Sequence, residues 1–183
     1  MPPADVADEI HSTDSRINRA EQELRRELIV HVTVQGADDI GDVLGYILLI
    51  KKIERIGDQA KNVFDLSDEG VDFSGADDVQ QFIDVHMAIS AMLDEVAELL
   101  VDPDPQRVAD FRARADAMRA QEEGHIREWM HSDLPGHHAV PRAGLHRYLK
   151  RIIANIAGVI TTITEPIQHQ GYFDQGTTDI TDD

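Results

Sequence analysis

The chain has 183 residues, with 35 acidic and 17 basic side chains, a formal net charge of −18 and no cysteine. The negative charge argues against nucleic acid or an anionic membrane surface as a partner, because their phosphates are bound by Lys and Arg. The lack of cysteine excludes disulfides and thiolate chemistry, and no apolar stretch is long enough to span a membrane. The N-terminus lacks the features of a signal peptide, so we expect a cytoplasmic protein.

Long helical segments alternate with short connections, and no run shows the period-two alternation that is typical of strands. The first predicted helix covers about residues 13–34, with Ser12 or Thr13 as its cap. The second covers about residues 37–66, and its apolar residues recur with a period near 3.6, which predicts one buried face. This stripe consists of Gly45, Leu49, Ile53, Ile56, Ala60 and Val63.

The third helix is predicted to start behind Ser74, with Asp77 completing a capping box. The fourth has Asp104 as its cap and Pro105 at the first helical position, where the missing N–H is harmless. It is predicted to end near His131.

The fifth helix is predicted over about residues 142–164, with Pro166 ending it. Five long helices with short connections predict an all-α antiparallel bundle. The polar stretch 167–183 is expected to be a loose tail.

Glu54 and Asp58 lie four residues apart in the second predicted helix, so their carboxylates share one helix face. We place this face roughly opposite the apolar stripe. Two acids at this spacing repel unless a cation bridges them, and their oxygen atoms suit Fe, Mn, Mg or Ca. The alternative, which spacing alone favours, is a solvated surface with ion pairs to neighbouring bases. These bases are Lys51, Lys52, Arg55 and Lys61.

The segment 53–63, IERIGDQAKNV, resembles the signature helix of the PhoU family of phosphate-uptake regulators. Upstream, DSRINRAE from Asp14 to Glu21 resembles the preceding family helix, and residues 34–40 resemble a degenerate form of the family's turn. The resemblance implies a surface metal site with Glu54 and Asp58 as ligands, joined by Asp14 and Glu21. Iron or another divalent metal is implied, with Mn, Mg and Zn less favoured.

Family members contain two related three-helix bundles, and residues 148–156 resemble a weakened second signature. Lys150 stands in the place of Glu54 and Ala154 in the place of Asp58, so we expect at most one metal site. We predict a single PhoU-like domain over 1–183, with a first repeat at 13–70 and a second at 74–166. The first repeat lacks the family's initial helix, so another subunit or protein is expected to cover the face that this leaves.

A group of histidines around the fourth connection is a second metal candidate, for zinc or nickel, although solvated loop histidines are the simpler interpretation. They are His125, His131, His137, His138 and His146. No P-loop, nucleophile elbow or His-Glu-x-x-His motif occurs, so catalysis has no positive evidence.

The resemblance implies a non-enzymatic regulator of phosphate uptake that contacts a phosphate transporter component, a sensor kinase or both, and that forms a homo-oligomer. Two alternatives stay open. One is a metal-binding protein or metal-dependent enzyme on a carboxylate-bearing helix bundle. The other is an adaptor that binds no metal.

Overall fold

The computed structural model describes residues 4–36 and 38–165. Within these ranges the chain forms five helices and no strand, which confirms the predicted all-α bundle. No helix in the described part is long and apolar enough to cross a membrane. The helices are α1 (Ala4–Gln35), α2 (Ile40–Asp68), α3 (Val79–Val101), α4 (Pro105–Met130) and α5 (Gly136–Thr164).

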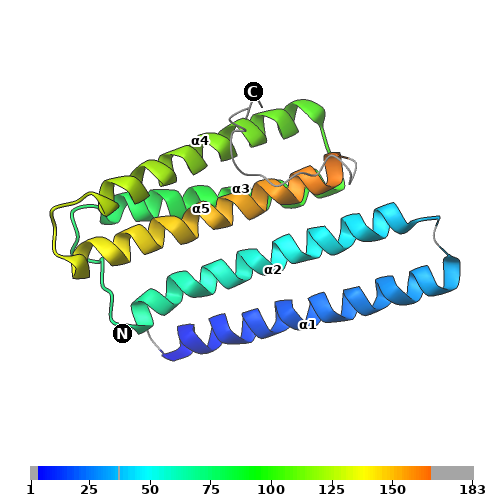
Figure 1. Cartoon of the computed structure of the whole chain (residues 1–183), viewed down its shortest axis with the longest axis horizontal. Coiled ribbons are helices and arrows are strands. Elements are labelled where there is room, and N and C mark those ends of the chain that lie inside the picture. Colours follow the sequence, from blue (N-terminus) through cyan, green and yellow to red (C-terminus); the bar gives the residue numbers. More distant parts are fainter. Residues whose placement is uncertain (1–3, 37, 166–183) are drawn as a thin grey trace, which may run out of the picture.

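Helix α5 lies at the centre of the bundle and packs against α2, α3 and α4 (Figure 1). Its residues 156–161 are all buried, as expected for a helix segment that is apolar on every side. Phe111 of α4 and Leu99 of α3 are fully buried in the same core. The core therefore belongs mainly to the second half of the chain.

Helices α1 and α2 form an antiparallel hairpin on the other side of α5. Three residues of the apolar stripe predicted for α2, Leu49, Ile56 and Val63, pack against the core. Ile53 and Ala60 of the same predicted stripe are exposed, so the prediction is wrong for these two. Gly158 of α5 makes room for Lys52 of α2, because a Cβ at position 158 would lie 2.7 Å from Lys52 Nζ. Helix α1 packs against α2 and has at most marginal contact with the other described helices, so it forms an edge of the molecule (Figure 1).

The predicted starts of the first two helices are wrong. Helix α1 begins at Ala4, so Ser12 and Thr13 lie inside it, and Ser12 Oγ donates to the carbonyl of Glu9 instead of capping. Helix α2 begins at Ile40 rather than at residue 37. Serine and threonine can cap a helix or bond back to the preceding turn, so sequence alone does not separate the two roles.

The cap predictions for α3 and α4 have opposite outcomes. Helix α3 begins at Val79, and the Ser74 N–H donates to Asp72 Oδ1 in a local turn, so the predicted capping box is wrong. At α4 the prediction is confirmed, because Asp104 Oδ1 accepts from the Arg107 N–H over 2.8 Å.

Helix α5 begins at Gly136, so Pro141 lies inside the helix and the predicted start at 142 is wrong. The position is tolerated because it lies only one turn beyond the start and costs a single backbone hydrogen bond. The helix ends at Thr164, close to the predicted end, whereas Pro166 and the predicted tail 167–183 lie outside the described residues. The boundary predicted between two repeats, at residues 70–74, falls in the connection between α2 and α3.

A buried polar pair joins α4 to α5. Glu122 Oε2 lies 2.7 Å from His146 Nδ1, and both side chains are almost fully enclosed. The His125 ring stacks on His146 with centroids 4.7 Å apart, and the Phe82 ring of α3 lies 5.4 Å away. Because buried polar groups are costly without partners, this pair favours one alignment of α4 along α5.

Replacing Glu122 by Ala removes the partner of His146 and leaves an imidazole buried without it. We expect the free energy of unfolding to fall by about 3 kcal/mol and Tm by roughly 6–12 °C, measured by thermal denaturation. Glu128→Ala, which removes an exposed carboxylate on the same helix, is the matched control and should leave Tm nearly unchanged. Equal Tm values for the two variants would contradict the structural role of the buried pair.

Candidate functional site

The contact between α1 and α2, here called the seam, brings the two helices close together at Gly57. A Cβ at Gly57 would lie 3.1 Å from Ile17 Cδ1 of α1, which is tighter than ordinary van der Waals contact. The glycine of the signature segment therefore accommodates the Ile17 side chain. About two turns further along, the His11 ring meets the Phe64 ring edge-on at 6.2 Å.

All four acids that the sequence singles out lie at the seam. Glu21 of α1 is buried, Glu54 of α2 retains only 11% of its side-chain exposure, and Asp14 and Asp58 are partly buried. The expectation that Glu54 and Asp58 face solvent is therefore wrong. The reason is that α2 has two neighbours: its apolar stripe faces α5, and its acidic side faces α1.

Two basic side chains neutralise the inner carboxylates. Lys51 Nζ lies 2.6 Å from Glu54 Oε2 and 3.8 Å from Glu21 Oε1, so one ammonium contacts acids on both helices. Arg25 Nη2 lies 2.6 Å from Glu21 Oε1, one turn along α1. The sequence predicted ion pairing of Lys51 along its own helix, and that is confirmed. The sequence analysis did not predict the contact of Lys51 with Glu21 across the seam, nor the ion pair between Arg25 and Glu21.

Asp58 lies in an electrostatic environment that is unfavourable to its ionised form. Burial raises the pKa of its carboxyl, and the nearby charges of Glu54 and Asp14 raise it further, against the opposing effect of Lys51 and Lys61. Asp14 instead accepts a hydrogen bond from Asn18 Nδ2 over 3.3 Å. The carboxylates of Glu54 and Asp14 therefore repel that of Asp58, and for Glu54 the Glu-x-x-x-Asp spacing predicts this repulsion.

The seam as described is not a ready-made metal site. In the described ranges, no three His, Asp or Glu side chains are arranged so that they could hold a metal ion together. The ammonium of Lys51 lies between Glu21 and Glu54, where a bridging cation would have to bind. A metal ion would therefore have to displace Lys51, and the metal assignment of these acids stays a prediction.

The same result applies to the histidine group that the sequence suggested. His146 and His125 meet inside the bundle, with Glu122 as the partner of His146. His131, His137 and His138 are exposed, with the rings of the last two 4.2 Å apart. In the segment that matches the weakened second signature, Lys150 Nζ donates to Glu123 Oε2 of α4 over 2.8 Å.

We expect Asp58→Asn to raise Tm at pH 7. The pKa of Asp58 is raised on folding, so its ionised form opposes folding above that pKa, and the opposition disappears as the pH falls below the ordinary value of 3.8. The advantage of the variant should therefore shrink between pH 7 and pH 4, as measured by thermal melts at each pH. Asp94→Asn, at an exposed position on α3, is the control. A Tm difference that does not depend on pH would contradict this account.

Comparison with known proteins gives one match. The model of the PhoU domain matches residues 3–66, which cover α1 and almost all of α2, including the seam and its four acids. Searches of curated proteins and of solved structures gave no match. The segment that forms the first two helices is therefore similar to a PhoU domain.

Proposed function

We propose that the protein regulates phosphate uptake through contacts of its helix surfaces with a phosphate transporter component, a sensor kinase or both. The observation that carries this proposal is the PhoU domain match, which coincides with the α1–α2 hairpin. Proteins of this family are regulators rather than enzymes. The hairpin offers what such a role requires, a long edge of the molecule that little else in the described chain covers.

An exposed apolar stripe at the start of α2 is our candidate for the partner contact. Ile40, Leu44 and Leu48 follow one another at intervals of four residues, so they lie along one side of the helix. Between 40% and 47% of each is exposed, although each is a large aliphatic residue. Contiguous exposed apolar surface on an acidic protein is typical of a site that binds another protein. Ile29, near the end of α1, is 64% exposed and adds to the apolar surface of the hairpin.

The second candidate is a role for a divalent cation at the seam. The specific observation in its favour is the gathering of Glu21, Glu54 and Asp58 around a single ammonium. Oxygen donors of this kind suit Mn, Mg or iron. Under this proposal the cation competes with Lys51 for the carboxylates, and the protein acts as an adaptor without metal whenever Lys51 holds the position.

Deleting the gene in its host should alter phosphate-responsive gene expression and phosphate uptake, and the wild-type gene should restore both. A Leu44→Asp, Leu48→Asp double variant should fold, because both side chains are exposed, but should fail to restore regulation. The matched control is Ile83→Asp, Met87→Asp, which alters a similarly exposed pair with the same spacing on α3. Unchanged expression and uptake after deletion would contradict the proposed function, and full activity of the α2 variant would contradict the contact site.

Replacing Lys51 by Met removes the ammonium from the seam. In metal-free buffer we expect the free energy of unfolding to fall by about 1 kcal/mol, since the ion pairs are partly exposed, and Tm to fall by roughly 2–4 °C. Added Mn²⁺ should raise Tm more in this variant than in the wild type, because the carboxylates are then free to bind it. Arg55→Met removes the same charge from an exposed position on α2 and is the control.

Metal analysis of the purified wild type, Glu54→Ala and Asp58→Ala completes this test. Equal metal content in the three proteins would show that the seam acids are not ligands. An equal response of the wild type and the Lys51 variant to Mn²⁺ would contradict the competition between Lys51 and the cation.

A further inference from the structure

Helix α5 carries no acidic residue, although the chain has 35 of them. Its basic residues are Arg142, Arg147, Lys150 and Arg151. Arg142 pairs with Asp78 of the segment before α3, and Lys150 pairs with Glu123 of α4. Arg147 and Arg151 are exposed, and within the described part of the chain their guanidinium groups take part in no ion pair or hydrogen bond. Helix α5 therefore presents positive charge that no described acid neutralises.

Helix α2 adds two bases on the same side of the molecule. Lys52 Nζ lies over Gly158 of α5, where a Cβ would come within 2.7 Å of it. Arg151 precedes Gly158 by seven residues and so projects from nearly the same side of α5. Arg55 follows Lys52 by one turn on the same face of α2. Burial lowers the pKa of Lys52, and the charge of Arg55 lowers it further. Arg55 is exposed, and no described residue forms an ion pair or hydrogen bond with its guanidinium.

The contact between Lys52 and Gly158 fixes the register of α2 and α5, which run in opposite directions (Figure 1). At a rise of about 1.5 Å per residue, Arg55 lies about 4.5 Å along the axis from this contact, and Arg151 lies about 10 Å from it in the same direction. Three cations from two helices therefore occupy one short stretch of the surface. We call Lys52, Arg55 and Arg151 the basic cluster.

The residues that share these faces between the ends of the basic cluster are uncharged. They are Gln59 of α2 and Ala154 and Asn155 of α5. A protein partner is usually anchored by large apolar or aromatic side chains at the centre of the contact, and this stretch of the two faces offers none. Amides beside free cations suit a small anion instead, because they can add hydrogen bonds to its oxygen atoms. The composition of the surface therefore favours a small anion over an acidic protein segment.

We propose that the basic cluster binds a short anion that contains two or more linked phosphoryl groups. Guanidinium groups hold phosphate oxygens bidentately, and an ammonium adds a point charge. Because the backbone positions of the three cations spread over about 10 Å, a chain of phosphoryl groups contacts all three with less rearrangement than a single phosphate ion. The net charge of −18 limits the length of the anion, since the rest of the surface repels whatever extends beyond the cluster. Inorganic oligophosphates and nucleotides share this chemistry.

Isothermal titration calorimetry tests the proposal on the full purified chain in metal-free buffer. Inorganic triphosphate should bind with a dissociation constant of about 100 μM at a salt concentration of about 50 mM, and binding should weaken as salt is added. Orthophosphate and tetraglutamate should bind about tenfold more weakly, because neither offers linked phosphoryl groups. Absence of triphosphate binding would overturn the proposal, and so would equal binding of orthophosphate or tetraglutamate.

ATP separates the two sources of the phosphoryl chain. Binding of ATP that is tighter than that of inorganic triphosphate would assign the site to nucleotides. Equal or weaker binding of ATP would assign it to the phosphoryl chain alone, since the base and ribose then add no contact.

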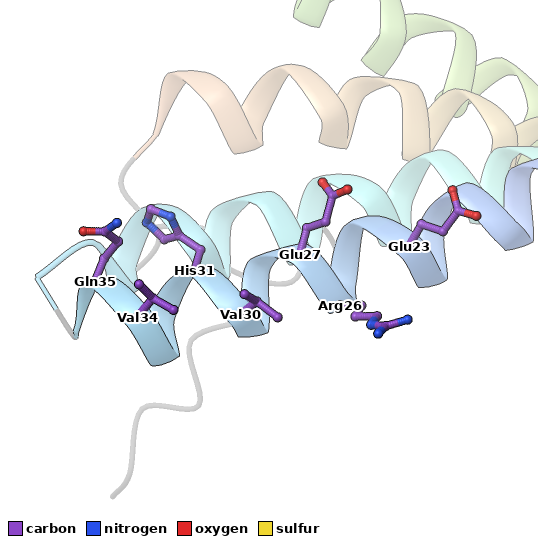
Figure 2. A pocket seen from close by; sticks show the side chains of 7 residues that line it. All are labelled: Glu23, Arg26, Glu27, Val30, His31, Val34 and Gln35. Carbon is purple, nitrogen blue, oxygen red and sulfur yellow. The ribbon is translucent and has the colours of Figure 1, made fainter.

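Substitution of the exposed arginines locates the site. Arg55→Gln and Arg151→Gln should each raise the dissociation constant of triphosphate about tenfold, because each removes charge-assisted hydrogen bonds. Arg26→Gln is the matched control. Arg26 is exposed, has no ion pair among the described residues and projects outward from α1 (Figure 2), so its loss should change the dissociation constant less than about twofold. Circular dichroism of each variant shows whether the helices are intact. Equal losses in all three variants, or no loss in the first two, would overturn the site.

Gly158 tests the part of Lys52. Gly158→Ala places a Cβ against the outer part of the Lys52 side chain, so the ammonium has to move while the helices stay in place. The dissociation constant of triphosphate should rise about threefold. Gly144→Ala on the same helix is the control, because a Cβ there meets nothing within 4 Å. Unchanged binding by the Gly158 variant would overturn the part assigned to Lys52. All these measurements use purified protein, so their outcome is independent of the gene deletion that tests the proposed function.

Discussion

Burial of α5 is the constraint on which the other helices depend. A helix whose residues 156–161 are all enclosed needs neighbours on every side, and α2, α3 and α4 supply them. The fully buried Phe111 and Leu99 show that the strongest apolar contacts lie in the second half of the chain. The segment that matches the PhoU domain lies in the first half of the chain. It contributes to this core mainly through one face of α2.

Much of the fold follows from elementary patterns in the sequence. Periodic apolar residues identified the five helices and their order, and the Asp104 cap with Pro105 fixed the start of α4 to the residue. The boundaries that were wrong involve residues with two roles. Ser12 lies equally well inside a helix, and Pro141 is tolerated near the beginning of one.

The candidate site was predictable in its residues but not in its environment. Spacing placed Glu54 and Asp58 on one face, and the resemblance added Asp14 and Glu21, but no local rule says that a second helix lies over them. The contact of Lys51 with Glu21 joins residues 30 positions apart, which depends on the register of the hairpin. The pair of Glu122 and His146 was missed for the same reason, since its members come from different helices and share no sequence motif.

The edge position of α1 has a consequence for dynamics. Among the described helices, α1 has substantial contacts only with α2. Helix α1 can therefore separate from α2 without exposing the core around α5. The free energy of such a local opening is therefore smaller than that of global unfolding, so its amide hydrogens exchange with solvent before those of α4 and α5. Part of the contact between α1 and α2 is made by charged side chains, so its separation exposes less apolar surface than the separation of a purely apolar contact would. Any ligand of the hairpin thus acts on an equilibrium between closed and open forms that the rest of the bundle does not share.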